Sequence, residues 1–297
     1  MAVTIGAGSD AWGIWHAEHH PAQIPWARYL DEVAEAGYRV VETGNFGYLP
    51  RDPAVARREL ATRGLMVPGG TFFAAVSDRS RRAAVFEGLD ATAAWLAAIG
   101  AGFLVLLDDF CRDPETGERR GPAQLDDAGF ADFVDTMHAL ARRARETHGL
   151  RLVFHPHCDA TIEHEVDIER LLEATDPGLV GLCMDTGHHL YSGGDPVAFW
   201  RRWHARMPYL HLKSMNGRML ETVRREDLPW AAAVARGVTE EPARGAVDFE
   251  GLAAALNESS YDGYAIVEQD MFPCDPAVPL PLAKRTIAYL RTLEFTT

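Results

Sequence analysis

The chain has 297 residues, of which 47% are hydrophobic and 24% are charged, as in an ordinary soluble globular protein. Its formal net charge of −14 comes from 29 basic and 43 acidic side chains, so its field repels nucleic acid and anionic membranes. The composition excludes disordered and fibrous classes and disfavours polyanionic partners.

Cysteine spacing and the absence of targeting signals indicate the compartment. Cys111, Cys158, Cys183 and Cys274 are widely spaced and form no CxxC pair, so we expect free thiols rather than disulfides or a Cys-rich zinc site. The first residues, MAVTIGAGSDAWG, do not resemble a secretory signal, and no run of about 20 apolar residues follows. We therefore expect a cytoplasmic protein that does not associate with membranes.

Strand-like and helix-like segments alternate from one end of the chain to the other. Short apolar segments, typical of strands covered on both faces, lie at 3–8, 38–44, 65–71, 103–109, 150–157, 179–186, 207–213 and 263–270. Helical patterns lie at 26–38, 52–65, 80–100, 125–149, 164–175, 195–206, 248–260 and 277–292. The second of these helices begins with Asp52 as N-cap and Pro53 in its first turn, and Gly64 marks its end.

This alternation predicts an α/β protein with the architecture of a single (β/α)8 TIM barrel spanning 1–297. A doubly wound open sheet is the alternative, but Gly6, Gly8 and Gly13 have the wrong spacing for a dinucleotide-binding turn. The one long irregular connection, at about 214–245, follows the seventh predicted strand. We expect it to lie at the C-terminal face of the barrel, where it could act as a lid over a substrate.

Ionisable residues stand where four of the apolar runs end. The run RLVFHPH carries His157, GLVGLCMDT carries Asp185, MPYLHLK carries His211 and GYAIVEQD carries Glu268. The carboxyl ends of the strands of a parallel barrel meet on one rim, so we expect these side chains to form one site. Two imidazoles and two carboxylates suit a divalent ion such as Mn²⁺, Co²⁺, Fe²⁺ or Zn²⁺, and Mg²⁺ fits less well.

Two more residues of these runs are predicted to be catalytic. His155 lies two residues before His157 and on the same face of the strand, so it can move a proton while His157 binds the metal. The alternative is that His155 only orients a ligand through a hydrogen bond. Lys213, two residues after His211, is expected to donate to a substrate oxygen or to stabilise an enolate.

Substrate binding is predicted for Glu42, Asp108, His188 and Trp15. Glu42 and Asp108 end the second and fourth predicted strands, where they could contact hydroxyl groups or merely cap helices. His188 follows Asp185, and Trp15 could form a wall of the pocket. The sequence contains no GxSxG, Ser/Lys, HExxH or Walker-type motif, which disfavours acyl transfer and phosphoryl transfer.

Several stretches resemble the sugar phosphate isomerase/epimerase superfamily, which has the xylose isomerase-like TIM barrel, and within it most closely the inosose (2-keto-myo-inositol) dehydratases. They are SDAWGIW, VVETGNFGYLP, FHPHCDATIEHEVDIERLLEATDP, MDTGHHLYSGGDPVAFW, YLHLKSMN, GAVDFEGLAAAL and VEQD. The resemblance implies a divalent metal, often manganese or cobalt, held by His157, Asp185, His211 and Glu268. It also implies a small-molecule keto-polyol or keto-sugar substrate, and it is compatible with a homo-oligomer.

The chemistry implied is removal of a proton next to a ketone, with the resulting enediolate stabilised by the metal. Loss of a β-substituent then gives a lyase of the inosose dehydratase type, which the HPH motif favours. Reprotonation at another carbon gives a ketose isomerase or epimerase, and this alternative uses the same site. A non-catalytic sugar-binding barrel ranks last because the whole ligand set is present, and a related endonuclease would require a basic face.

Overall fold

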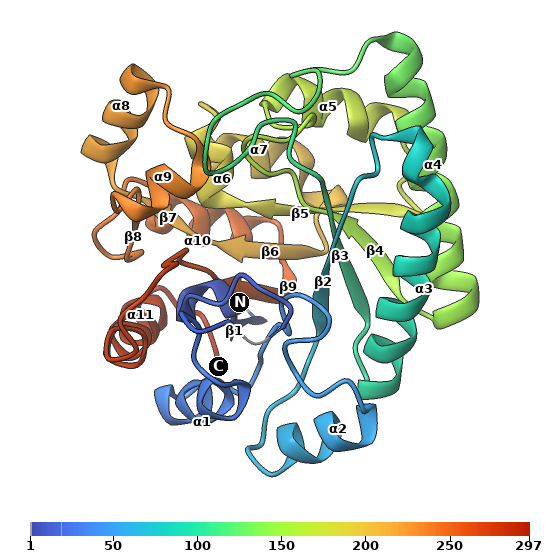
Figure 1. Cartoon of the computed structure of the whole chain (residues 1–297). Helices are drawn as coiled ribbons and strands as arrows, with labels where there is room; N and C mark the ends of the chain where they lie inside the picture. Colours follow the sequence, from blue (N-terminus) through green and yellow to red (C-terminus); the bar gives the residue numbers. More distant parts are fainter. Residues whose placement is uncertain (1, 19) are drawn as a thin grey trace.

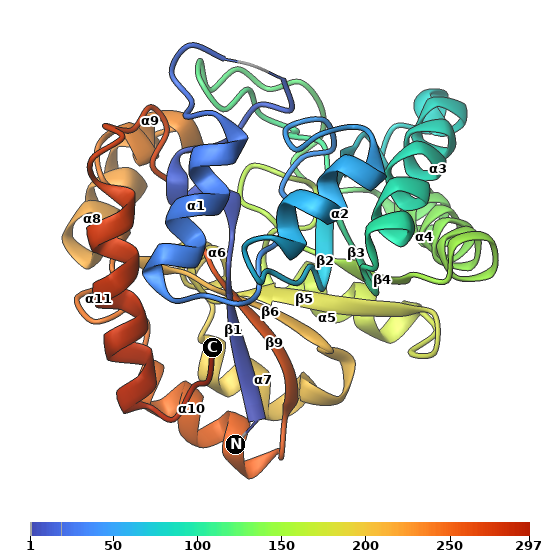
Figure 2. The ribbon, with the colours of Figure 1, turned by 90° about the horizontal axis from the view of Figure 1, so that it is seen from below.

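Within the described residues, 2–18 and 20–297, the computed structural model contains seven parallel strands in one curved sheet, in the order β1-β9-β6-β5-β4-β3-β2. The bounds are β1 Ala2–Ala7, β2 Gly69–Ala74, β3 Phe103–Asp108, β4 Arg151–Phe154, β5 Val180–Asp185, β6 Tyr209–Leu212 and β9 Asp262–Val267. Helices surround the sheet on its outer side (Figures 1 and 2). The expected TIM barrel is confirmed, although one strand position is irregular.

The irregular position lies between β1 and β2, where a regular strand was expected over 38–44. Val41 forms an isolated bridge to Ala7 and Val40 one to Met66 instead. Glu42 N donates to Ala7 O (2.9 Å) and Val41 N donates to Met66 O (2.9 Å). The strand expected at 65–71 begins only at Gly69, since Pro68 has no N–H to continue the ladder from Met66. These bridges close the barrel in place of a continuous ladder.

The outer helices match the predicted ones, with ends that differ by a few residues. They are α1 Trp26–Ala36, α2 Pro53–Ala61, α3 Arg82–Ile99, α4 Asp127–His148, α5 Glu165–Ala174, α7 Pro196–Trp203, α10 Phe249–Glu258 and α11 Pro279–Thr292. Short helical turns occur at η1 Ser9–Trp12, η2 Arg79–Arg81, α6 Thr186–Tyr191 and η3 His204–Arg206. Asp52 caps α2 by accepting from Ala54 N, with Pro53 at its first position, as predicted.

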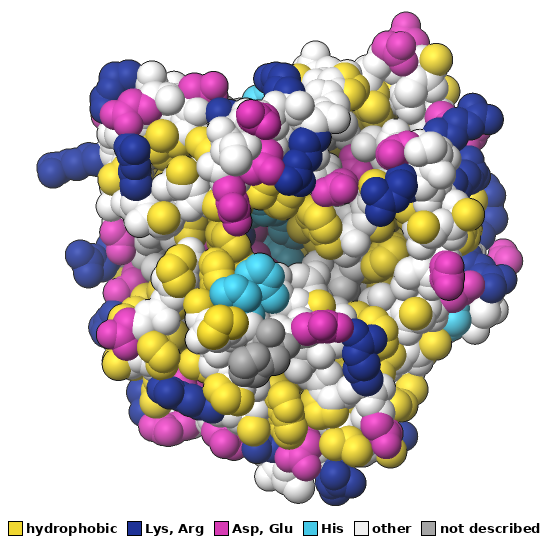
Figure 3. Space-filling view, viewed as in Figure 1, with side chains coloured by type: hydrophobic (Ala, Val, Ile, Leu, Met, Phe, Trp, Pro, Cys, Tyr) yellow, Lys and Arg dark blue, Asp and Glu magenta, His cyan; other side chains and the backbone are white. Residues whose placement is uncertain are grey.

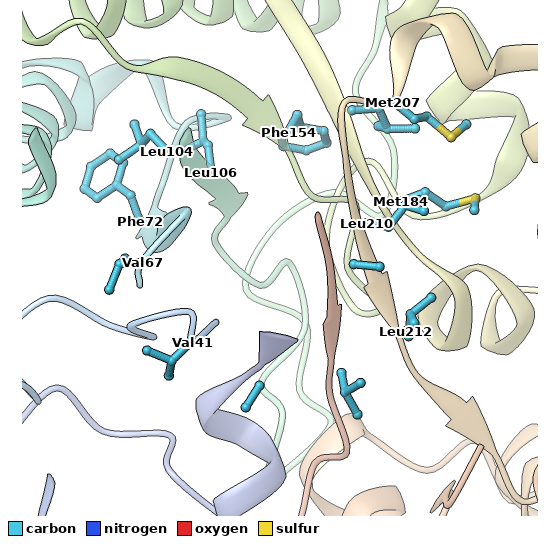
Figure 4. Close-up of a cluster of buried hydrophobic side chains, with 14 of the residues drawn as sticks. Val41, Val67, Phe72, Leu104, Leu106, Phe154, Met184, Met207, Leu210 and Leu212 are labelled. Atoms are coloured by element: carbon cyan, nitrogen blue, oxygen red, sulfur yellow. The ribbon is translucent and has the colours of Figure 1, made fainter. Parts of the chain in front are cut away.

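Side chains along each strand alternate between two cores. The barrel interior contains Val40, Val105, Leu107, Val153, Cys183, Tyr209 and Ile266. The larger core lies between strands and helices, and Figure 4 shows Val41, Val67, Phe72, Leu104, Leu106, Phe154, Met184, Met207, Leu210 and Leu212 within it. Consecutive residues of one strand therefore belong to different cores, and this alternation sets which strand-end groups face the barrel axis.

The connection from 214 to 245 has its own secondary structure. It consists of β7 Ser214–Met215, α8 Gly217–Glu226, α9 Trp230–Ala235 and β8 Thr239–Glu240, with β7 and β8 antiparallel. We call these residues the insertion; it lies beside α6 (Figure 1). A small separate core holds it together, made of Cys158, Met215, Leu220, Val223, Trp230, Ala233, Val234 and Val238. In the described parts of the chain, no helix is both long and apolar enough to cross a bilayer.

The interior core predicts a clear stability difference between two Val→Ala substitutions. Val153 is fully buried on β4, so Val153→Ala should lower the free energy of unfolding by about 2 kcal/mol, because two buried carbons are lost and a cavity remains. Val166, which is 66% exposed on α5, is the control, and its replacement by Ala should change stability by less than about 0.5 kcal/mol. Urea denaturation of both variants measures this, and equal midpoints would contradict the assignment of the interior core.

Candidate active site

Four strand ends place ionisable side chains at the top of the barrel interior. His155 follows β4, Asp185 ends β5, His211 lies on β6 and Glu268 follows β9. Each lies two residues after a residue of the interior core (Val153, Cys183, Tyr209 and Ile266), so the alternation directs it inward. One ligand atom from each of the four lies within 4.8 Å of the others, and all four side chains are buried.

The atoms that face one another in this cluster are polar and incompletely satisfied. His211 Nδ1 lies 3.2 Å from Glu268 Oε1 and 4.0 Å from Asp185 Oδ2. Asp185 Oδ1 accepts from Gly187 N (2.7 Å) and His188 N (2.9 Å) at the start of α6, so its Oδ2 is left for the site.

Apart from the ion pair of Asp185 Oδ2 with Lys213 Nζ, Asp185 Oδ2 and His211 Nδ1 make no hydrogen bond to any described residue. A buried polar atom without a partner costs about 1–3 kcal/mol. A divalent cation would satisfy these atoms together, and the two-nitrogen, two-oxygen donor set suits a first-row ion. The residues present therefore fit a metal ion.

His157 lies outside this four-residue cluster, in contrast to the expectation that it is a ligand and His155 the catalytic base. Its Nδ1 is 2.7 Å from the carbonyl oxygen of Cys158, which can only accept, so Nδ1 carries the proton and Nε2 has the free lone pair. The physical reason for the difference is that β4 ends at Phe154. His155 is the last residue in register, since its N–H still donates to Leu106 O.

Lys213 brings a positive charge to the cluster. Its Nζ lies 3.1 Å from both Asp185 Oδ2 and Glu268 Oε2, and 2.7 Å from Asp270 Oδ2. Burial lowers the pKa of Lys213, but the surrounding carboxylates of Asp185, Asp270 and Glu268 outweigh it and raise that pKa well above its usual value. Lys213 is therefore an ammonium group.

His188 connects Lys213 to Cys158. The ammonium group of Lys213 only donates, and it lies 2.9 Å from His188 Nε2, so Nε2 accepts and Nδ1 carries the proton. That Nδ1 lies 3.2 Å from Cys158 Sγ and donates to it. His157, Cys158 and His188 form a second group with metal-ligand atoms close together, but these hydrogen bonds occupy the Nδ1 atoms of both histidines.

Asp10 and Asp270 also line the site, and the sequence reasoning missed them. Burial, together with Glu268 and Asp270, raises the pKa of Asp10 well above its usual value. Burial also raises the pKa of Asp270, although Lys213 opposes it. Burial acts in the same direction on Glu268, but His211 and Lys213 outweigh it and bring its pKa to about 2. Such an accumulation of buried acidic groups favours a cation in the site.

Glu42 and Asp108, which were expected to contact substrate, do not line the cavity. Glu42 is buried beside His211, whose Nε2 lies 3.2 Å from its Oε2. Asp108 has the outward register of Leu104 and Leu106, and it accepts from Ser77 N (3.0 Å) and Thr161 Oγ1 (2.8 Å). The alternation of side chains could have placed both from the sequence.

Three members of the cluster, His155, His211 and Glu268, form the floor of a cavity of about 200 Å³ whose outer wall is largely aromatic. Trp15, Phe73, Phe110 and Trp230 line it, together with His157 and His188. Trp15 was expected there, and its Nε1 donates to Asp270 Oδ1 (3.2 Å). Figure 3 shows the mouth as a hollow in which histidine side chains are visible among hydrophobic ones. The cavity thus has a charged floor and an apolar rim.

A family model described as "Xylose isomerase-like TIM barrel" matches residues 30–293. The chain belongs to this family. An inosose dehydratase of Geobacillus kaustophilus (strain HTA426) is 35% identical over 270 residues, which cover 89% of this chain and 86% of that protein.

Solved structures have the same fold as this xylose isomerase-like barrel. One is the probable 3-DHS dehydratase AsbF from Bacillus anthracis, with 14% identity, a TM-score of 0.75, and coverage of 97% of this chain and 99% of that chain. Another is the IolI protein with a bound zinc atom, with 12% identity, a TM-score of 0.75, and coverage of 99% and 100%. At these identities the likeness concerns the fold alone.

The position of Lys213 in this xylose isomerase-like barrel depends on a glycine. A Cβ at Gly187 would lie 2.6 Å from Lys213 Cγ and 2.8 Å from Lys213 Cβ, so Gly187→Ala should push the lysine away from its carboxylates. We expect turnover to fall about 100-fold, because small displacements in an active site have effects of that size. Gly217→Ala is the control, since its Cβ would meet only Ala246 Cβ at 3.6 Å. Equal turnover of the two variants would show that the position of Lys213 is not critical.

Proposed function

We propose that the chain is a divalent-metal-dependent lyase that removes water from a cyclic keto-polyol or keto-sugar, in the manner of an inosose dehydratase. One observation carries the proposal: His155, Asp185, His211 and Glu268 bring four buried ligand atoms within 4.8 Å of one another at the barrel top, and Asp185 Oδ2 and His211 Nδ1 make no hydrogen bond to a described residue. The 35% identity to an inosose dehydratase, over most of both chains, supports the substrate class.

These four residues would hold the metal, which we propose to be Mn²⁺ or Co²⁺, with Zn²⁺ and Fe²⁺ suited to the same donors. His155 takes the position first given to His157, because its side chain faces Asp185 (Nε2 to Oδ2, 3.7 Å). When bound, such an ion supplies Lewis-acid polarisation of a substrate ketone.

His157 is the proposed proton acceptor. It lines the cavity, and its Nε2 lone pair is free because Nδ1 donates to the Cys158 carbonyl oxygen. Burial, with His155 and Lys213, lowers the pKa of His157 to about 3, so the ring is neutral and can accept. In the elimination, the C–H bond next to the ketone breaks and its proton goes to His157.

Lys213 and the neighbouring acids serve the other end of the elimination. The ammonium group of Lys213 donates to a substrate oxygen that gains negative charge, as first expected from the sequence. The β C–O bond breaks, and the leaving hydroxyl takes a proton from the carboxyl group of Asp10, whose pKa is raised by burial, to become water. A Schiff base on Lys213 is disfavoured, because its carboxylate neighbours keep the amine protonated.

A ketose isomerase or epimerase is the second candidate function. The observation in its favour is that a proton acceptor, His157, and a proton donor, Lys213, line the same cavity. A proton returned to carbon rather than to a leaving hydroxyl gives an isomer.

We further propose that the insertion is a lid and that the enzyme is cytoplasmic. Trp230 supports the lid, since its ring packs 4.6 Å from that of His188 and its backbone N–H donates to Asp159 Oδ2 (2.9 Å). The cytoplasmic location is supported by the four free cysteines among the described residues, which suit a reducing compartment.

The two histidines of the HPH motif allow a matched test of the site. His155→Ala should weaken Mn²⁺ binding at least about 100-fold, because it removes a ligand, and turnover should be lost with it. His157→Ala should retain one bound metal per chain but lose about 10²- to 10⁴-fold in turnover, as expected for a proton acceptor. Isothermal titration with Mn²⁺ and steady-state kinetics distinguish the two, and metal loss in the His157 variant alone would reverse the assignment.

A substrate panel separates the lyase from the isomerase. The chain loaded with Mn²⁺ should convert a keto-inositol to a product with the absorbance of an enone or diketone. Ketohexoses and 3-keto-glycosides complete the panel, and chelation of the metal should abolish turnover. An isomeric sugar without a chromophore would replace the lyase with the second candidate, and no reaction with any member would contradict both.

A further inference from the structure

Glu42 is a buried carboxylate that touches neither the cavity nor the outer surface. It is 1% exposed and lies inside the barrel among Val40, Cys183 and Tyr209 of the interior core. Its Oε2 is 3.2 Å from His211 Nε2, and its Oε1 accepts from Thr71 Oγ1 at 3.2 Å. Burial of a carboxylate is costly, so the hydrogen-bond partners of Glu42 should give the reason that it is buried.

We propose that Glu42 is a positioning residue, which fixes His211 with Nε2 protonated and Nδ1 directed at the metal. The inference rests on the proposed function, because it requires a metal ion at His155, Asp185, His211 and Glu268.

The argument follows from the hydrogen-bond roles of the two side chains. A carboxylate oxygen accepts, so His211 Nε2 must donate to Glu42. A metal-bound imidazole is neutral and has one N–H, so with Nε2 protonated the lone pair on Nδ1 is directed at the ion. Nδ1 is the nitrogen that lies near Glu268 Oε1 (3.2 Å) and Asp185 Oδ2 (4.0 Å) and makes no hydrogen bond to a described residue. Glu42 thus selects the tautomer that presents a lone pair to the other donors.

The geometry also argues against Glu42 as a metal ligand or a substrate contact. Its carboxylate lies on the Nε2 side of the His211 ring, whereas Asp185 and Glu268 lie on the Nδ1 side. Glu42 is not among the residues that line the cavity. Thr71 fixes its second oxygen, so the carboxylate has little freedom to turn toward the site. Thr71 and Glu42 are therefore hydrogen-bonded in series to His211, and they would influence a bound metal only through the imidazole of His211.

The test compares two buried carboxylates of similar exposure. Glu42→Gln should weaken Co²⁺ binding about 10- to 100-fold, the usual effect of losing a partner that orients a metal-bound histidine. It should leave the stoichiometry and the positions of the Co²⁺ absorption bands unchanged, because the ligands are the same. Asp108→Asn is the matched control, since Asp108 is equally buried but bonds only to Ser77 and Thr161, and it should bind Co²⁺ like the wild type.

Two results would overturn the proposal. Wild-type affinity in Glu42→Gln would show that Glu42 does not position His211. Shifted Co²⁺ bands, or loss of stoichiometric binding, would show that Glu42 is itself a ligand. Failure of the wild type to bind Co²⁺ would instead remove the proposed function and the inference together, so the two failures are distinguishable.

A second variant keeps the test valid if Glu42→Gln does not fold. Thr71→Val removes only the donor to Glu42 Oε1, so the carboxylate remains but is held less firmly. We expect Co²⁺ affinity to fall about 3- to 10-fold, within the range for changes beyond the ligands themselves. Thermal unfolding of the metal-free protein verifies folding of each variant, and unchanged affinity in Thr71→Val would contradict the proposal.

Discussion

The alternation of side chains along short parallel strands is the constraint on which the rest of this structure depends. In a closed barrel, one set of positions faces the helices and the other faces the axis. The inward-facing side chains, such as Val153 and Cys183, are mostly apolar up to the last inward position at the carboxyl end of each strand. At that last position the barrel interior opens into the cavity, so an ionisable side chain can contact a ligand while the apolar residues below it remain buried. The cluster of His155, Asp185, His211 and Glu268 is therefore the last layer of the barrel interior, in which ionisable residues take the place of apolar ones.

Charge balance is the second organising feature. Asp185, Glu268 and Asp270 surround the ammonium of Lys213, and Asp10 adds a further acid whose pKa is raised. In so buried a place, uncompensated carboxylates would destabilise the barrel. Lys213 supplies part of the compensation and is itself fixed by Thr186, whose hydroxyl bonds to both its N–H and its carbonyl oxygen. Stability and reactivity of the site are therefore linked through the same few charges.

The sequence predicted the barrel because strand and helix patterns are local. Helix ends at Asp52 and Gly37 follow from capping and left-handed backbone preferences, which the residues carry themselves. The four strand ends were recognised for the same reason. Strict use of the alternation would also have turned Asp108 outward, placed Glu42 beneath the site and put His155 in the cluster.

Other features depend on contacts between distant segments, which no local pattern contains. Asp10 reaches the site through η1, and Trp230 through the insertion. The hydrogen-bonded series Lys213–His188–Cys158 joins three separate segments of the chain, so the tautomer of His188 can be assigned only from coordinates. The irregular segment at 38–44 likewise reflects Pro68 on its neighbour rather than its own residues.

The insertion has a core of its own, and that core meets the barrel at Cys158. A unit with separate packing can open at a free energy well below that of global unfolding. Such opening would carry Trp230 away from the histidines while the parallel strands stay paired. Amide exchange in α8 and α9 would then be faster than in β5 and β6. Substitutions inside this small core would also reshape the cavity wall at little cost to the barrel.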